Sequence, residues 1–409
     1  MIFVADVVIA IALGLCLYTY VGYPLILKVL SGSRRFRAAA PASAAWPHIS
    51  IAIPVYNEAA VIADTLERIL ALDYPSDRRQ VLVVSDGSTD GTDEIVLQFA
   101  PRGVELLRLP QRRGKTAAEN AARSRLAGEI IINTDASVRI DEAAVKHLVA
   151  AFHDPTVGVA SGRDMSVSNL DDRLNPGEHA YVGYDMWVRD LETSLSGIVG
   201  ASGCLYAIRR ELHMQHMPHG LSRDFGAALV AREHGYRAVS VPAAVCYVPR
   251  SLSLRREYRR KVRTMARGLR TLWYKRALLD ARRYGLFAWM LFSHKLCRWL
   301  MPWATVLGAG AVVLVALAPG HRWGAGVLTL GGIALLAAAI GWLWPEGRPM
   351  PRLISLPTYA LSANIAALEA WVSALGPGGT SLWEPTRRGT PAVGHGVPDG
   401  PDVARIQQL

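Results

Sequence analysis

The hydrophobic residues of this 409-residue chain form long apolar stretches near its two ends and short apolar runs between them. Residues 1–30 contain only Asp6 and Lys28 as charged side chains, and residues 300–318 and 323–344 carry almost no charge. Crossing a bilayer takes roughly 20 apolar residues. Each stretch is long enough, so the pattern predicts one transmembrane helix near the amino terminus (1–30) and further ones within residues 299–376.

The middle of the chain alternates between two periodicities. Short runs rich in β-branched residues predict three buried strands, at residues 49–55, 81–84 and 130–132. Helical spacing predicts helices at residues 58–72, 90–99 and 115–126. This β-α-β-α-α-β order predicts an α/β domain with a mostly parallel sheet, over residues 46–248.

Polar residues follow each of the three predicted strands. Tyr56 and Glu58 come after the first strand, Asp86 after the second and Asp135 after the third. Each acid alone could be a turn or first-turn residue. Ligands of such sheets bind at the carboxyl ends of the strands, so three acids at three strand ends favour a shared site.

Cations precede the helix that begins at Lys115. The segment Arg112-Arg113-Gly114-Lys115 places positive charge beside a helix amino terminus, which suits a phosphate. A solvated basic loop is the alternative.

The positive charge of the chain is concentrated in one segment. The formal net charge is +11, and residues 250–283 contain 13 basic residues against two acidic ones. Residues 250–298 are therefore expected to form basic interfacial helices that contact membrane lipids or a phosphate ligand. No aromatic stacking pattern accompanies the charge, so a nucleic-acid partner is not expected.

The ends of the chain bear on location. The first apolar stretch is followed rather than preceded by basic residues, which favours a retained anchor over a cleaved signal and puts the middle domain in the cytoplasm. Residues 354–375 could span or re-enter the membrane, which leaves three or four spans open. Residues 377–409 are Gly- and Pro-rich, and we expect a flexible tail. The four cysteines show no disulfide or zinc spacing.

Several motifs, taken together and in order, make the chain resemble a known family. They are Pro54-Val-Tyr-Asn-Glu58, Ser85-Asp-Gly-Ser-Thr-Asp-Gly-Thr92, Gly114-Lys115 with Asn120, Thr134-Asp135-Ala136, Gly200-Ala-Ser-Gly203-Cys-Leu-Tyr-Ala-Ile-Arg-Arg210 and Ser222-Arg223-Asp224. This pattern resembles membrane-bound family 2 glycosyltransferases with a GT-A fold, which are related to cellulose, chitin and hyaluronan synthases. The resemblance covers residues 49–270.

The resemblance implies a nucleotide-sugar donor. It assigns donor binding to these residues: Pro54, Tyr56, Glu58, Asp86, Lys115 and Asp135. It also implies a divalent cation, Mg²⁺ or Mn²⁺, on the diphosphate, held by a D-x-D motif.

This chain departs from that motif, because Asp135-Ala136-Ser137 has Ser at its third position. Asp135 alone could take the ribose or metal role with Ser137 as a weak neutral ligand. In an alternative register, Asn133-Thr134-Asp135, Asp135 is itself the metal residue. Either way one carboxylate replaces two, so we expect weak metal binding without donor.

The resemblance also implies a general base and a cationic helix. Asp224 would accept the proton of the acceptor hydroxyl, in an inverting reaction; the alternative is that it only caps the helix at residues 225–234. Arg260 and Arg263 occupy the place of a Q-x-x-R-W motif near the diphosphate and acceptor, although Thr264 replaces the Trp. One alternative is a register through Arg267. Another is that the arginines at helical spacing form a basic stripe that only rests on anionic lipid; they are Arg256, Arg260, Arg263, Arg267 and Arg270.

The sequence therefore predicts a glycosyltransferase of the hexosyltransferase type in a bacterial-type inner membrane, multi-pass, with a cytoplasmic catalytic domain. It would move a sugar, expected to be UDP-linked, to a lipid-linked or polysaccharide acceptor. One alternative is a processive synthase that extrudes its polymer. An alternative of another class is a non-catalytic nucleotide-binding membrane receptor.

Overall fold

The structure is a computed structural model that describes six parts of the chain. These are residues 1–32, 46–167, 176–249, 253–345, 348 and 350–376. The predicted flexible tail, residues 377–409, lies outside the described residues.

One eight-stranded sheet organises the middle of the chain, with the order β3-β2-β1-β4-β7-β6-β8-β5. Its strands are β1 (Ile49–Val55), β2 (Arg79–Ser85), β3 (Val104–Arg108), β4 (Ile130–Thr134), β5 (Arg139–Ile140), β6 (Val157–Val167), β7 (Leu205–Arg209) and β8 (Arg237–Pro249). Strands β1 to β4 pair in parallel, β6 also pairs in parallel with β8, and β7 and β5 run antiparallel to their neighbours. The predicted mostly parallel α/β sheet is confirmed.

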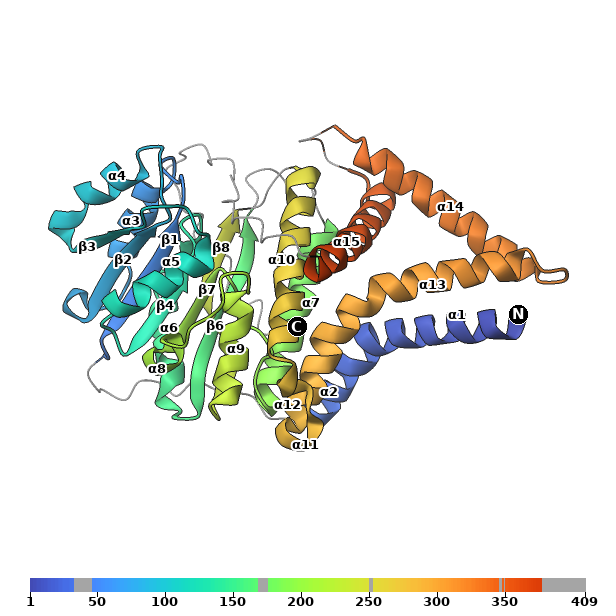
Figure 1. Ribbon diagram of the computed structural model, residues 1–409, viewed down its shortest axis with the longest axis horizontal. Helices are drawn as coiled ribbons and strands as arrows, with labels where there is room; N and C mark the ends of the chain where they lie inside the picture. Colours follow the sequence, from blue (N-terminus) through green and yellow to red (C-terminus); the bar gives the residue numbers. More distant parts are fainter. Residues whose placement is uncertain (33–45, 168–175, 250–252, 346–347, 349, 377–409) are drawn as a thin grey trace, which may run out of the picture.

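The helices fall into those of the α/β domain and those outside it, and the helices outside it reach from the middle of the molecule to its far end (Figure 1). Those of the domain are α3 (Ile62–Leu70), α4 (Thr92–Gln98), α5 (Lys115–Ala122), α6 (Ala144–Ala150), α7 (Pro176–Leu195), α8 (Arg210–His213) and α9 (Arg223–Glu233). The others are α1 (Ile2–Leu17), α2 (Tyr23–Ser31), α10 (Leu254–Tyr274), α11 (Ala281–Tyr284), α12 (Leu286–Leu291), α13 (Arg298–Ala316), α14 (Arg322–Trp342) and α15 (Arg352–Leu375).

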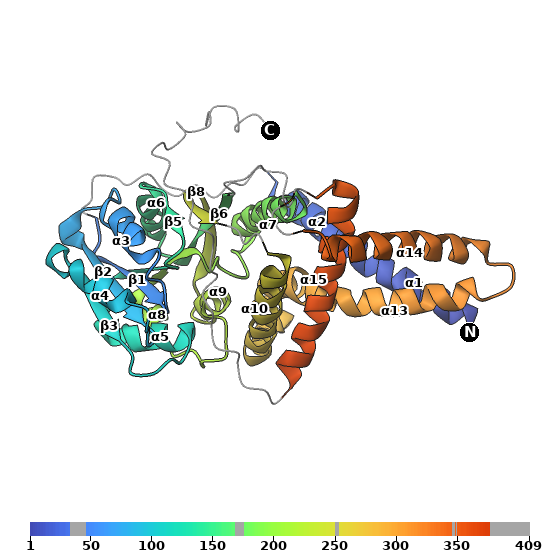
Figure 2. The ribbon, with the colours of Figure 1, turned by 90° about the horizontal axis from the view of Figure 1, so that it is seen from above.

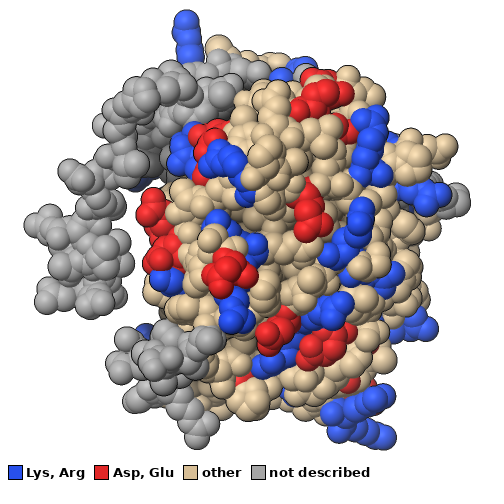
Figure 3. Space-filling model, turned by 90° about the vertical axis from the view of Figure 1, so that its left-hand side faces the viewer, with Lys and Arg blue, Asp and Glu red and all other residues tan. Residues whose placement is uncertain are grey.

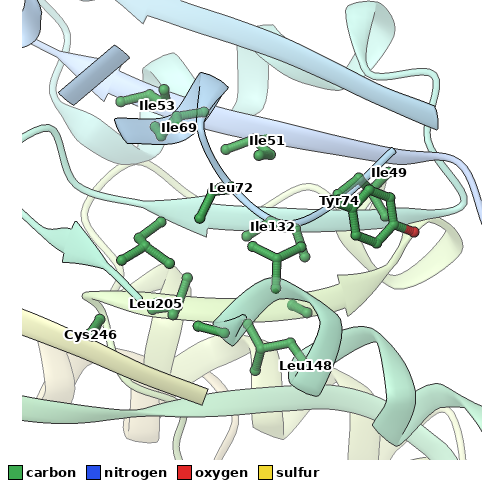
Figure 4. Packing of buried hydrophobic residues seen from close by; sticks show 14 of the residues in the cluster. Ile49, Ile51, Ile53, Ile69, Leu72, Tyr74, Ile132, Leu148, Leu205 and Cys246 are labelled. Carbon is green, nitrogen blue, oxygen red and sulfur yellow. The ribbon is translucent and has the colours of Figure 1, made fainter. Parts of the chain in front are cut away.

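Alternate residues of the central strands pack into two cores, one on each face of the sheet. Ile49, Ile51 and Ile53 face the core formed with α3, α4 and α6 (Figure 4). Ala52 faces the opposite core, together with Ile131 and residues of α5 and α9. The five named strand residues are at most 1% exposed. Burial on both faces explains why the first strand reads as a continuous apolar run.

The first predicted helix is shorter than expected. Helical spacing predicted residues 58–72, whereas α3 begins at Ile62. Asn57 adopts a positive φ of 53° and the following amides turn toward the loop after β2, so the chain leaves β1 in a turn before the helix starts.

Three described helices are long and apolar enough to cross a membrane: Ile2–Ser31, Leu286–Ala316 and Trp323–Trp342. The first two are continuous through π-helical turns, Tyr18–Gly22 and Phe292–Cys297, which meet each other. There the Tyr18 hydroxyl lies 2.6 Å from the Ser293 hydroxyl. Helices α1 and α13 extend side by side away from the sheet (Figures 1 and 2).

Helix α15 behaves differently from these three. It packs along α10 and α14 beside the domain, and Figure 2 shows it crossing the direction of α13 and α14. The Tyr258 hydroxyl of α10 donates to Glu369 at 2.6 Å, and the indole of Trp371 donates to the carbonyl of Trp299 at 2.8 Å. These contacts hold α15 beside the domain, and α15 is not among the described helices that are long and apolar enough to cross a membrane.

Charges of both signs are interspersed on the face of the α/β domain turned away from the apolar helices (Figure 3). The concentrated positive charge lies elsewhere, since most of the 250–283 segment forms α10 and α11. The basic segment is thus placed next to the start of the Leu286–Ala316 helix.

Candidate active site

The loops that follow β1, β2 and β4 meet at one edge of the sheet. Strand β1 lies between β2 and β4 and is parallel to both, so their carboxyl ends coincide. The side-chain oxygen of Asn57 accepts from the Thr89 amide at 2.8 Å, and the Glu58 amide donates to the Thr92 hydroxyl at 2.9 Å. The first two loops are therefore tied together, and the loop after β1 carries Tyr56 and Glu58, whose donor-binding role stays a prediction.

Asp86 holds the loop that carries the cations. Its carboxylate is 1% exposed, and its two oxygens accept from the amides of Arg113 and Gly114, each at 2.7 Å. Gly87 makes this approach possible, because it has a φ of +73° and a Cβ there would lie 3.1 Å from the Arg112 nitrogen. The role of Asp86 toward the donor nucleoside remains a prediction.

Tyr56 and Arg112 form a flat surface at the same edge. The guanidinium of Arg112 lies 3.8 Å from the centre of the Tyr56 ring. Such stacking orients the planar cation and is worth about 0.5–1 kcal/mol at an exposed site. Pro54, the first residue of the Pro54–Glu58 motif, lies near the end of β1 and pairs with Val84 of β2.

A charged pair stands at the end of β4. The Lys115 ammonium, from the first turn of α5, lies 2.5 Å from a carboxylate oxygen of Asp135, and both side chains are largely buried. The same ammonium is 3.4 Å from the carbonyl oxygen of Gly203. The structure thus brings together two of the predicted donor-binding residues.

Asp224 reaches the same place from the amino terminus of α9. A Cβ on Gly203 would lie 2.6 Å from an Asp224 carboxylate oxygen, so the side chain rests directly on this glycine. The other carboxylate oxygen accepts from the Ser222 hydroxyl. Ser222, not Asp224, holds the N-cap position. Lys115, Asp135 and Asp224 therefore meet around Gly203.

Arg267 of α10 is a site residue that the motif comparison assigned only as an alternative register. Its guanidinium donates to the Thr116 hydroxyl at 2.6 Å and to the Leu221 carbonyl at 2.7 Å. It thus links the basic helix to the start of α5 and to the segment before Asp224. The regular arginine spacing of α10 gave no sign of which arginine would enter the domain.

Arg260 and Arg263 lie on the same helix, about two turns and one turn before Arg267. The Arg260 guanidinium pairs with Glu257 at 2.6 Å, and the glutamate is the less exposed of the two side chains. Their predicted contacts with diphosphate or acceptor stay a prediction.

The charges at this edge alter one another's protonation. Burial works against a charged Lys115, but Asp135, Glu119 and Asp224 outweigh burial and raise the pKa of Lys115. Burial lowers the pKa of Arg267, and the carboxylates of Asp224 and Glu119 oppose that effect. At neutral pH both groups remain cations that can receive a phosphate.

The residues present can hold a divalent cation only together with other ligands. No group of three or more His, Cys, Asp or Glu side chains suited to a metal occurs among the described residues. Asp135 offers one carboxylate, and Ser137 stands two residues away. Mg²⁺ is commonly held by one or two carboxylates plus substrate phosphates, so this donor set fits a metal that arrives with the diphosphate.

The chain is similar in sequence and fold to known glycosyltransferases. Residues 50–216 match the family model for glycosyl transferase family 2. The chain is 29% identical over 170 residues to a beta-monoglucosyldiacylglycerol synthase from Nostoc, which covers 40% of this chain and 36% of the relative. It is 24% identical over 214 residues to a poly-beta-1,6-N-acetyl-D-glucosamine synthase from Staphylococcus aureus, covering 50% of this chain and 51% of that one. The matches thus span about a third to half of these relatives.

A solved structure resembles nearly the whole chain. It is a mannosyltransferase from Pyrobaculum calidifontis in complex with GDP-Man and Mn²⁺, with a TM-score of 0.68 and 26% identity. The match covers 90% of this chain and 99% of that one. The likeness therefore extends beyond the sheet to the helices at the other end of the molecule.

Proposed function

We propose that this chain, which carries a glycosyl transferase family 2 domain, moves a sugar from a nucleotide-sugar donor to a lipid-linked or glycan acceptor beside a membrane. The observation that carries the proposal is the meeting of Lys115, Asp135 and Asp224 around Gly203. Two of these groups suit a diphosphate and its cation, and the third suits proton abstraction.

The donor is proposed to lie along the carboxyl edge of the sheet. In this proposal Tyr56, Glu58 and Asp86 would contact the nucleoside, and Lys115 and Arg267 would neutralise the diphosphate as the glycosidic bond breaks; the Tyr56–Arg112 stacking and the two cations support it. The predicted donor is a UDP-sugar. The Pyrobaculum mannosyltransferase was solved with GDP-Man, so both nucleotides belong in a donor screen.

A divalent cation fits the same proposal. Asp135 would hold Mg²⁺ or Mn²⁺ together with the diphosphate, and the metal would neutralise charge on the leaving group. The Pyrobaculum structure contains Mn²⁺, which supports a metal at this type of site. Because Lys115 already pairs with Asp135, we expect metal to bind weakly until donor is present.

Asp224 is the proposed general base. Its carboxylate accepts the proton of the acceptor hydroxyl, whose oxygen forms a bond to the anomeric carbon while the bond from that carbon to the diphosphate breaks. The nucleoside diphosphate leaves, and direct attack inverts the anomeric centre. Ser222 holds one carboxylate oxygen and Gly203 contacts the other, which fixes the orientation of the base.

The acceptor is proposed to come from the membrane side. The three apolar helices and basic α10 adjoin the domain, and the named relatives act in glycolipid and polysaccharide synthesis. A cytoplasmic orientation in an inner membrane belongs to this proposal.

Replacing Asp224 by Asn tests the assignment. Asp224→Asn should lower the rate of sugar transfer by about 10²–10⁴-fold, because the base is lost, while nucleotide affinity stays close to wild type. Nucleotide release and calorimetric nucleotide binding measure the two effects. Asp77→Asn, at an exposed site, is the control. Unchanged transfer by Asp224→Asn would contradict the role.

A polymer-extending synthase is the second candidate, favoured by the similarity to the Staphylococcus polysaccharide synthase. Thr264 in place of the family's Trp argues against it. Product length decides, since transfer of one sugar per acceptor would exclude a processive synthase.

A further inference from the structure

A buried acid that the proposed mechanism does not use lies one turn after Lys115. Glu119 of α5 is 2% exposed, and its Oε2 atom has no hydrogen-bond partner within the described parts of the chain. The phenol oxygen of Tyr206, on β7, is likewise buried and without such a partner. A carboxylate oxygen left in this state is costly, since burial without a hydrogen bond costs about 1–3 kcal/mol, and more for a charged group.

The charged groups that act on Glu119 come from several elements. Lys115 precedes it by one turn on its own helix, and Arg223 and Asp224 belong to α9. Asp135 follows β4, and Arg267 of α10 also feels the Glu119 carboxylate. Glu119 is thus surrounded by the groups of the proposed active site without being bonded to one of them in the described structure.

Glu119 and the charged groups around it comprise three cations and three acids. The cations are Lys115, Arg223 and Arg267, and the acids are Glu119, Asp135 and Asp224. An ionised Glu119 balances the set when the site is empty. A donor diphosphate adds further negative charge to the same cations, and the balance then favours a neutral Glu119.

We propose that Glu119 is a positioning residue that exchanges its charge for that of the donor: its carboxylate balances Lys115, Arg223 and Arg267 in the empty site and takes up a proton when the diphosphate arrives. This inference rests on the proposed function, since it needs a diphosphate at this edge. It predicts that nucleotide binding is coupled to proton uptake.

Electrostatics and the position of Glu119 on α5 both support the coupling. Burial raises the pKa of Glu119, Lys115 and Arg223 oppose that effect, and Asp224 and Asp135 add to it. Because the cations help to keep the carboxyl ionised, engaging them with phosphate raises its pKa further. In addition, α5 begins at the Lys115 that pairs with Asp135, so Glu119 is fixed relative to the donor site by a single turn of helix.

The test is calorimetry of UDP and GDP binding to the full-length protein in detergent at pH 8. The terminal phosphate of the nucleotide, with a second pKa of about 6, is already ionised at that pH. Titration in two buffers of different ionisation enthalpy gives the number of protons taken up per nucleotide bound. The wild type should take up a measurable fraction of a proton.

Glu119→Gln keeps the shape of the side chain and removes its charge. It should abolish the proton uptake and bind nucleoside diphosphate up to about tenfold more tightly, because a repulsive charge is gone. Slower release of the product would then lower turnover while the Michaelis constant for the donor falls. Glu94→Gln, the same change on the exposed side of α4, is the control and should match the wild type.

The outcomes separate this inference from the proposed function. Wild-type protein that binds neither nucleotide would contradict both. Nucleotide binding with equal proton uptake and equal affinity in wild type and Glu119→Gln would overturn the role of Glu119 alone. If Glu119→Gln does not fold, the wild-type titration decides, and zero proton uptake between pH 7 and 9 overturns the inference.

Discussion

At the scale of single residues, Gly203 is the point on which the proposed site depends. Lys115 donates toward its carbonyl, and Asp224 rests against its Cα. The absence of a side chain lets Asp224, the proposed base, lie beside Lys115. The sequence indicated Gly203 only as part of the Gly200–Arg210 block, without its spatial role.

Gly203→Ala should therefore impair transfer. The added Cβ would lie 2.6 Å from an Asp224 carboxylate oxygen, so the base must move, and a displacement of about 1 Å can lower turnover by about 10²-fold. Nucleotide-release rates measure the effect. Gly183→Ala is the matched control, because a Cβ there meets nothing within 4 Å. Equal losses in both variants, or none in Gly203→Ala, would contradict the close packing.

The serine at position 137 is the residue-scale departure from the D-x-D motif. With one carboxylate at Asp135 and a lysine paired to it, the site holds less negative charge than a two-carboxylate motif would. Lys115 and Arg267 therefore carry a larger share of the neutralisation of the diphosphate in this account.

At the scale of elements, α10 connects the membrane side to the site. The guanidinium of Arg267 on this helix points into the domain and donates to the Thr116 hydroxyl and the Leu221 carbonyl. On its other side α10 packs against α15, where the Ser373 carbonyl accepts a hydrogen bond from Arg270. The helix is thus held between the domain and α15.

Arg267→Gln should lower turnover by about ten- to a hundredfold. The change removes charge-assisted hydrogen bonds worth about 1.5–3 kcal/mol and a cation near the diphosphate. Donor kinetics and thermal unfolding measure activity and folding separately. Arg259→Gln, an exposed arginine of the same helix, should behave like the wild type. Similar losses in both variants would instead indicate that only the overall charge of α10 matters.

The elements also show which parts of the fold the sequence could predict. The runs of residues 49–55, 81–84 and 130–132 were recognised because central parallel strands are buried on both faces. Strand β3 was not predicted, because at the edge of the sheet it carries exposed Glu105 and Arg108 and has no apolar run. The site acids followed from the predicted strand ends, whereas Arg267 and Glu119 enter through long-range packing that no local pattern reports.

At the scale of the whole molecule, a polar cluster joins the apolar helices to the catalytic domain. Asp185 of α7 accepts from Arg298 at 2.7 Å and lies 3.2 Å from His294. Glu192, on the same helix, accepts from the Tyr23 hydroxyl at 2.5 Å and lies 2.6 Å from His294. The first two long apolar helices therefore share partners on α7.

Asp185→Asn should destabilise the protein by up to about 3–5 kcal/mol at neutral pH, since it removes the carboxylate that accepts from the buried Arg298 guanidinium. Although burial acts to raise it, the pKa of Asp185 is held well below its ordinary value by His294, Lys295 and Arg298. A lowered pKa stabilises the fold above the ordinary value, and this contribution is lost as the pH falls through the folded value.

Thermal unfolding of both proteins in one detergent across pH 3–8 measures this difference. It should be largest near neutral pH and shrink in acid. Asp64→Asn is the control, because Asp64 pairs with the exposed side chain of Arg68. A difference independent of pH would contradict the assigned cluster.

The most direct test of the central claim is a donor screen with the full-length protein in native membranes. Release of nucleoside diphosphate from UDP- and GDP-sugars is measured with Mg²⁺, with Mn²⁺ and with EDTA. The account predicts release from at least one donor, dependent on added metal and abolished by Asp224→Asn. A protein that binds these nucleotides but releases none from any sugar donor would be a receptor and would contradict the account.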